Sequence, residues 1–579
     1  MNISLLSLII WLPMGSLVIL LLIPCHCQKA FRFITLCTTL LQGIGILLVL
    51  RHCSSDLSES ISAPRGLQLA EQFTWMRLSL GSLGTLSIDY FVGVDGLNIG
   101  LLMLAVVILI IGVVASWNIY QYTKAYFALY LLLDTLLIGS FVALDFLLFY
   151  IFFEVALVPI YFFIGLWGGP KRTYAATQFF LYTLLGTILI LIVLIGLGLS
   201  VYDPVETGIQ AGVLTQSDTV STENIAAIQS MVRAKEIASK DIVHSFNLIL
   251  MLDADNFIPD SILSLVSGRV LWGQAIRLVA FLSLVIGFLI KLAAIPFHTW
   301  LPAAHVEAPT PISIVLAAVL LKIGGYGLVR TAYSIFPEGA LYYGFWIGLL
   351  GIVSISYAAL NALAMQDLKR MIAYSSIAHM GFFLLGLASL TYEGVNGALY
   401  QMVSHGFISA MLFLVAGVMD ARTHDRSLEN YSGLATPMPY YATIAMTAFF
   451  AALGLPGFSG FIAELLVLLG VFQSPSFNKL LPTWMGFVGA VGILLNAIYF
   501  VWTIQRMFWG NFSLRFPTWR PALQDLRTKE YILFVPLIVL TVTLGIFPHL
   551  LLDLFRDSVS HFIATVHTVG RDNLELITR

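Results

Sequence analysis

Residues 291–330 read KLAAIPFHTWLPAAHVEAPTPISIVLAAVLLKIGGYGLVR. The stretch holds two apolar segments: the first contains Lys291 and is interrupted at Pro296, and the second contains Lys322. Charged side chains in the middle of a membrane span are costly and usually mark an ion or proton path. A proline inside a span frees backbone groups, which is tolerated where neighbours or water satisfy them. The stretch therefore predicts a buried proton site beside a broken helix.

The composition indicates that most of the chain faces lipid or other helices. Hydrophobic residues make up 59% of the 579 residues and charged residues only 10%, whereas globular domains carry about 25% charged residues. Apolar stretches of about 20 residues recur, and each can cross ~30 Å of hydrocarbon. We therefore expect an all-α polytopic membrane protein with about fourteen transmembrane helices. The net charge of -2 and the lack of a basic stripe give no indication of a nucleic-acid partner.

Hydropathy predicts where the spans begin and end. The fourteen spans are expected at 4–23, 33–50, 97–115, 126–143, 146–167, 175–201, 277–301, 311–333, 341–363, 372–391, 396–419, 438–474, 484–507 and 530–550. Two long stretches lie between spans, a mixed polar and aromatic loop at 51–95 and a polar insert at 202–272. Lys and Arg gather in alternate short loops, which places both termini and the insert outside. Trp300, near a span end, is expected to anchor it at the membrane interface.

Few ionisable residues fall inside the expected spans. Lys291 and Lys322 are the basic ones, because Arg330, at the outer end of the span expected at 311–333, is counted with the short outside loop and Lys369 with an inside loop. The acids and histidines at or near membrane depth are Glu154, Glu464, Asp134, His298, His379 and His405. These groups form a candidate proton relay, since each titrates or accepts a hydrogen bond. Alternatively, such histidines are structural hydrogen-bonding groups, and such lysines reach towards the interface.

A second break mirrors the first. GLPGFSGF at 454–461 interrupts the twelfth span, because three glycines and a proline within eight residues do not fit an unstrained helix. Pro296 and Pro456 are five span positions apart, and transporter folds often contain inverted repeats with matching interrupted helices. We therefore expect four parts: an N-terminal part at 1–125, inverted five-helix repeats at 126–333 and 341–507, and a C-terminal part at 508–579.

Several long motifs carry a resemblance to a known family. They are FVGVDGLNIG at 91–100, DFLLFYIFFEVALVPIYFFIGLWGGPKR at 145–172, the opening stretch, DLKRMIAYSSIAHMGF at 367–382, QMVSHGF at 401–407 and GLPGFSGFIAE at 454–464. The chain resembles the antiporter-like membrane subunits of proton-translocating NADH–quinone oxidoreductase, respiratory complex I, and among them the chain M type. The resemblance implies that Glu154 neighbours Lys291, that Lys322 is a central relay residue and that Glu464 is the terminal acid. Chains L and N usually have Lys at this last position.

The resemblance also implies what the chain works with. No phosphate-binding glycine loop, haem ligand pair or iron–sulfur cysteine spacing is present. No cofactor or metal is therefore expected in this chain, and NADH, FMN, iron–sulfur clusters and quinone are expected in partner subunits. The expected partners are chains of the L and N types, through them the peripheral redox arm, and the lipid bilayer. The expected location is the bacterial cytoplasmic membrane rather than the mitochondrial inner membrane.

Three alternatives remain at this stage. The chain could be a subunit of a multi-subunit sodium/proton antiporter, which shares the expected fold but is not coupled to a dehydrogenase. It could belong to a proton-pumping membrane hydrogenase. A structural spacer whose charges are relics is disfavoured, because the chain retains Glu154, Lys291, Lys322 and Glu464.

Overall fold

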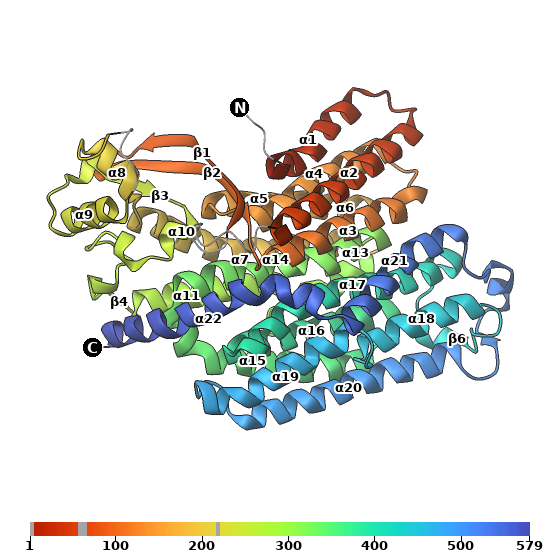
Figure 1. Ribbon diagram of the computed structural model, residues 1–579. Helices are drawn as coiled ribbons and strands as arrows, with labels where there is room; N and C mark the ends of the chain where they lie inside the picture. The colour runs from red at the N-terminus through yellow and green to blue at the C-terminus, as the bar shows by residue number, and fades with distance from the viewer. Residues whose placement is uncertain (1–4, 56–66, 216–220, 579) are drawn as a thin grey trace.

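The computed structural model describes residues 5–55, 67–215 and 221–578 and shows a bundle of long apolar helices (Figure 1). The membrane-length helices are α1 (Leu5–Leu22), α2 (Gln28–Ser55), α3 (Ile99–Ala115), α4 (Thr123–Val142), α5 (Phe146–Val155) with α6 (Leu157–Trp167), α7 (Arg172–Ser200), α15 (Pro337–Ala364), α16 (Leu368–Ser389), α17 (Tyr392–Thr423), α20 (Thr483–Phe508) and α21 (Thr528–Ile546). Three further spans are interrupted or irregular. The expected all-α polytopic class is confirmed.

Both predicted breaks are present. The first separates α11 (Ile276–Leu292) from α12 (Trp300–Glu307), and the second separates α18 (Pro439–Ala452) from α19 (Ser459–Phe477). Among the described residues, thirteen helices are long and apolar enough to cross a membrane. The 17-residue α11, with α12 beyond the break, accounts for the remaining expected span.

Trp300 corrects one expectation. It is fully buried, and its Nε1 donates a 2.9 Å hydrogen bond to the carbonyl oxygen of Ile290. The expectation of an interfacial anchor is therefore wrong. The indole instead satisfies a carbonyl near the end of α11, where the helix stops and cannot satisfy its last carbonyl groups itself.

The eighth span is irregular in a way that the sequence did not indicate. It is built from α13 (Thr310–Val315), the π-helical turn η9 (Leu316–Leu320), α14 (Leu321–Gly327) and the π-helical turn η10 (Leu328–Tyr333). Its membrane-length window is entirely buried, so it lies at the centre of the bundle. π-helical turns are rare and occur frequently at functional sites.

The long loop and the polar insert form one extramembrane unit. Strands β1 (Gln68–Ser79) and β2 (Thr85–Val94) pair as an antiparallel hairpin, and β3 (Val243–Ser245) of the insert pairs in parallel with β2. The insert also contains α8 (Pro204–Gln210) and α9 (Thr222–Arg233), and it has a small core of its own. The hairpin and the insert lie together at one end of the bundle (Figure 1). The strands correct the expectation that residues 51–95 are only a loop.

The C-terminal part ends in a long helix, α22 (His549–Thr578). Phe555 packs against Gly100 of α3, and Asn573 donates a 3.2 Å hydrogen bond to Glu338 at the start of α15. Glu338 also accepts a 2.6 Å bond from Arg277 of α11, whose guanidinium donates to the carbonyl of Leu263 in the insert. This buried cluster ties the insert, both helix starts and α22 together.

Two basic residues lie deeper than expected. Arg330 belongs to η10 rather than to a loop, and its guanidinium is 2.7 Å from Asp95. Lys369 begins the buried part of α16, is only 1% exposed, and donates a 3.1 Å hydrogen bond to the carbonyl of Ala308. Both assignments to loops are therefore wrong, because local polar partners satisfy these cations at the ends of helices. The division into two inverted repeats and the membrane orientation stay predictions.

Candidate functional site

Four of the candidate residues form one continuous buried chain of contacts. Lys322 Nζ lies 2.7 Å from His405 Nδ1. The rings of His405 and His379 have centroids 5.2 Å apart. His379 Nδ1 in turn lies 3.4 Å from Glu464 Oε1. Each of the four residues is at most 4% exposed, so this series of contacts runs through the interior of the bundle.

Lys322 and Glu464, the two ends of this series of contacts, are each placed by a local feature of the backbone. Lys322 Nζ donates a 2.6 Å hydrogen bond to the carbonyl of Ala317 in the π-helical turn η9. The turn therefore provides an acceptor for an otherwise costly buried ammonium group. Glu464 lies in α19, shortly after the second break. Gly454 in that break has φ 77°, and a Cβ there would lie 2.8 Å from Glu464 Oε2, so glycine allows the carboxylate to approach the backbone.

Lys291 occupies a more apolar setting. It is 1% exposed, and its Nζ lies 4.0 Å from the centre of the Phe153 ring and 3.4 Å from the Phe153 carbonyl oxygen. Its ammonium interacts electrostatically with Glu154, the next residue of α5. Glu154 is half-buried, and its Oε2 has no hydrogen-bond partner in the described part of the chain. No ion pair within 4 Å joins the two side chains among the described residues, so the expected Glu154–Lys291 coupling is not a direct contact there.

The two lysines sit on tightly packed helices. A Cβ on Gly324 of α14 would meet the backbone nitrogen of Leu292 at 3.0 Å and the Cβ of Lys291 at 3.3 Å. Gly324 is two residues from Lys322 along the same helix. A glycine therefore permits the close approach of the helix that carries Lys322 to the helix that carries Lys291.

Two candidates, His298 and Asp134, lie apart from the series of contacts between Lys322 and Glu464. His298 is packed between aromatic rings, with ring centroids 5.5 Å from Tyr357 and 6.1 Å from Tyr374. Asp134 is fully buried in α4, where neither carboxylate oxygen has a hydrogen-bond partner among the described atoms and Gln42 of α2 is the polar side chain that interacts with it. The structure does not bring either residue into contact with Lys322, His405, His379 or Glu464.

One buried histidine, His305, was not among the residues that the sequence predicted for the relay. His305 in α12 is 0% exposed, its ring stacks on Phe413 at 4.5 Å, and both ring nitrogens lack partners within the described residues. The charges of Lys369 and Lys322 both act on its ring. His305 lies four residues beyond the end of the span expected at 277–301 and seven residues after His298, and its position in the same mainly apolar stretch was the available signal.

The arrangement is suited to moving protons rather than to binding a metal. Lysine, histidine and glutamate all take up and release protons. Within residues 5–55, 67–215 and 221–578, no group of three or more His, Cys, Asp or Glu is placed to hold a metal ion. A membrane bundle with two broken helices and a buried file of ionisable side chains defines an antiporter-like membrane protein.

The sequence comparison identifies the family. The model of the NADH:quinone oxidoreductase/Mrp antiporter transmembrane family matches residues 143–202 and 206–496, more than half of the chain. The chain belongs to this family. It is 35% identical over 572 residues to NADH-quinone oxidoreductase subunit M of Rhodobacter capsulatus, and the match covers 97% of both chains. The resemblance that the motifs indicated is thus confirmed.

Solved structures agree with this assignment. A chain of respiratory complex I from Thermus thermophilus with bound NADH is similar at 25% identity and a TM-score of 0.72, covering 97% of this chain and 100% of that one. A chain of the Mrp complex from Dietzia sp. DQ12-45-1b has a TM-score of 0.69 at 17% identity, covering 99% and 100%. The second likeness shows the fold alone. The chain is therefore a multi-pass membrane protein with the fold of these membrane subunits.

Proposed function

We propose that this chain is an M-type membrane-arm subunit of a proton-translocating NADH–quinone oxidoreductase and moves protons through its buried axis. The observation that carries the proposal is the series of buried contacts from Lys322 through His405 and His379 to Glu464, in which the two imidazoles lie ring to ring. The 35% identity to an NADH-quinone oxidoreductase subunit along nearly the whole chain supports the assignment to this enzyme rather than to an antiporter or a hydrogenase.

The relay has two parts. In the first part, Glu154 sets the charge state of Lys291, because a nearby carboxylate favours the protonated ammonium and burial favours the neutral amine. In the second part, a proton released towards Lys322 continues through the two imidazoles to Glu464 and leaves on the outer side. His298, His305 and Asp134 are secondary candidates. Moving one charge against 100 mV requires about 2.3 kcal/mol, which a change of about two pKa units in one relay group can supply.

The driving energy comes from partner subunits. This chain supplies proton binding and a path, whereas NADH, FMN, iron–sulfur clusters and quinone belong to the peripheral arm and its junction with the membrane. Subunits of the L and N types flank this one in the membrane arm. The reaction class is that of a translocase, and the location is the bacterial cytoplasmic membrane. Relatives in Rhodobacter and Rickettsia support that location.

Substitution of Lys291 tests whether it carries protons. Lys291→Ala removes the titrating group and leaves Glu154 without its cation. Lys291→Arg keeps the charge, but arginine hardly releases its proton. If Lys291 carries protons, both variants should assemble and lose most proton uptake, and NADH oxidation should slow with it.

The measurement is proton uptake and NADH oxidation by the whole complex in sealed vesicles, with assembly checked by co-purification of the other subunits. Near-normal pumping by the arginine variant would reject the carrier role and leave Lys291 as a counter-ion of Glu154.

A further inference from the structure

The polar insert changes character at its C-terminal end. Acidic residues occur repeatedly from Asp203 to Asp260, but none occurs in residues 261–276. In the latter segment, Arg269 is the only charged residue, and it is exposed. Most of the insert is therefore suited to water, whereas the segment 261–276, which leads from the insert into α11, carries no negative charge that would repel lipid phosphates.

The same segment exposes large apolar side chains. The exposed fractions are 42% for Ile262, 84% for Val266, 64% for Val270, 41% for Leu271 and 86% for Trp272. Single exposed apolar residues are common, but a contiguous exposed group marks a surface that binds something. We call residues 262–272 the apolar rim.

The backbone holds the apolar rim in place. Strands β4 (Val270–Leu271) and β5 (Gln274–Ala275) form a short hairpin. Its two turn residues, Trp272 and Gly273, have φ angles of 53° and 77°, the left-handed conformations that a tight two-residue hairpin requires. The Ile276 amide donates a 3.0 Å hydrogen bond to the Arg269 carbonyl. The indole of Trp272 is thus presented at the tip of a defined turn, directly before α11.

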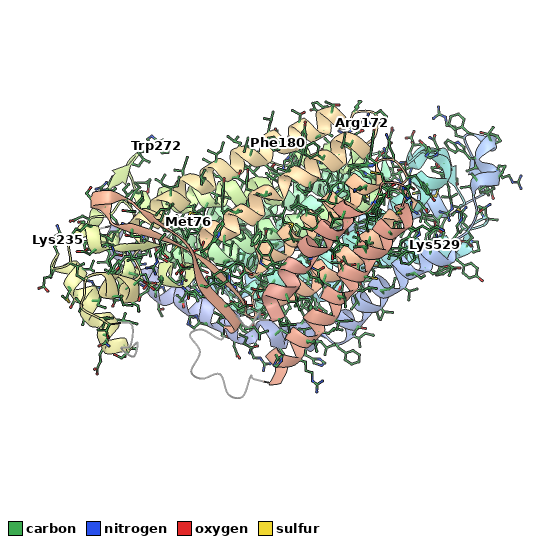
Figure 2. The ribbon with its side chains drawn as sticks, turned by 90° about the horizontal axis from the view of Figure 1, so that it is seen from above. Met76, Arg172, Phe180, Lys235, Trp272 and Lys529 are labelled. Atoms are coloured by element: carbon green, nitrogen blue, oxygen red, sulfur yellow. The ribbon has the colours of Figure 1, made fainter. Side chains whose placement is uncertain are left out.

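The position of the apolar rim identifies what covers it. Leu263 packs against Gly196 of α7, and the Leu263 and Ile258 amides donate to the side chain and the carbonyl of Ser200 at the end of α7. The exposed apolar residues of α7 are Leu181, Leu185, Ile188, Ile192, Ile195 and Leu199. Their spacing of three to four residues makes one stripe along the helix, as on a face that contacts hydrocarbon. Trp272 and Phe180 lie along the same edge of the molecule (Figure 2).

We propose that the apolar rim is a lipid-binding anchor that seats the insert in the headgroup region of the outer leaflet. The lipid-facing stripe of α7 ends at Leu199, next to the residues that hold the apolar rim. The rim therefore lies at the boundary between the hydrocarbon core and the headgroup region. Tryptophan prefers this depth because its ring is apolar and its N–H can reach polar groups. Arg269 beside it meets the phosphates. The anchor also fixes the start of α11, the broken helix that carries Lys291.

Depth-dependent fluorescence quenching tests this proposal in the whole complex. Trp272→Cys is made in a chain whose native cysteines, at 25, 27, 37 and 53, are replaced by serine. The assembled complex is labelled with an environment-sensitive fluorophore and placed in phospholipid vesicles. Quenching is measured with nitroxides on the lipid headgroup, with nitroxides on the acyl chain and with aqueous iodide. Val266→Cys supplies a second position on the rim if the first variant does not assemble.

Two positions calibrate the measurement. Leu185→Cys lies on the α7 stripe and should respond mainly to the acyl-chain nitroxide, whereas Val213→Cys, 43% exposed on the polar part of the insert, should respond to iodide. We expect the probe at Trp272 to be quenched at least threefold more by the headgroup nitroxide than the probe at Val213. Quenching by iodide alone would overturn the proposal. A probe that no quencher reaches, or a cysteine that cannot be labelled, would show that a neighbouring subunit covers the rim and would also overturn it.

Discussion

Gly324→Ala should disturb proton transfer without removing any ionisable group. The added Cβ would lie 3.0 Å from the backbone nitrogen of Leu292, 3.2 Å from the carbonyl oxygen of Phe288 and 3.3 Å from the Cβ of Lys291. Two of these neighbours are backbone atoms of α11, so a side-chain rotation cannot relieve the contact. The helix that carries Lys322 must instead move away from the helix that carries Lys291, by a few tenths of an ångström.

The expected magnitude follows from two opposing terms. Overpacking of a tight interior contact costs about 1–3 kcal/mol. Alanine in place of a helical glycine returns about 1 kcal/mol. The net change in folding free energy is therefore ~0–2 kcal/mol, and we expect the complex to stay folded. An equal increase in the barrier to proton transfer, caused by the wider gap between the two lysine helices, would slow transfer by at most roughly 30-fold, at about 1.4 kcal/mol for each factor of ten.

The assay is proton uptake per NADH oxidised by the whole complex in vesicles, together with the thermal unfolding midpoint of the purified complex. Gly15→Ala is the matched control, because it lies in the membrane helix α1 and its added Cβ would meet nothing within 4 Å. If Gly324→Ala pumps as well as Gly15→Ala, close packing between the two lysine helices is not needed for transfer, and the reasoning fails.

Three further predictions concern other parts of the molecule. His305→Phe should preserve the stacking on Phe413 but remove a titrating group, so proton uptake should fall several-fold while assembly is retained; unchanged uptake would exclude His305 from the path. Reporter fusions after residues 172 and 240 should report opposite sides of the membrane, and the same side for both would contradict the predicted orientation. Burial lowers the pKa of His244 in β3, so the insert should resist proteolysis equally at all pH values above about 6.5 and become more sensitive as the pH falls further. Equal sensitivity at pH 5 and pH 8 would contradict this.

The spans and breaks were predictable because their causes are local. An apolar stretch of about 20 residues indicates by its own composition that it lies in the membrane. The prolines and glycines at and near Pro296 and Pro456 indicate that helical hydrogen bonds are lost at those positions. Lys322 was recognisable for a similar reason, since a charge within such a stretch is costly wherever its partners lie.

The connections between these residues were not predictable in the same way. Lys322 and His405 are 83 positions apart, and their contact depends on how α14 and α17 pack. The π-helical turn that supplies the Ala317 carbonyl has no proline or glycine to signal it. The helix α22 was missed because a search for apolar spans passes over an amphipathic surface helix. Strands β1 and β2 were not predicted because their structure depends on pairing with each other across the turn between them. Neither segment shows that pairing by itself.

The two imidazoles between Lys322 and Glu464 have a physical consequence for the proposed relay. An ammonium and a carboxylate about 4 Å apart attract each other by about 4 kcal/mol at an effective dielectric constant of ~20. Such a pair would hold its proton and slow its release by about a thousandfold, at about 1.4 kcal/mol for each factor of ten. At ~10 Å the attraction falls to about 1.7 kcal/mol. His405 and His379 lie between the two charged groups, and an imidazole is able both to accept and to donate a proton. The spacing thus favours transfer over formation of a stable ion pair, and for this reason the contact chain is more informative about function than either charged residue alone.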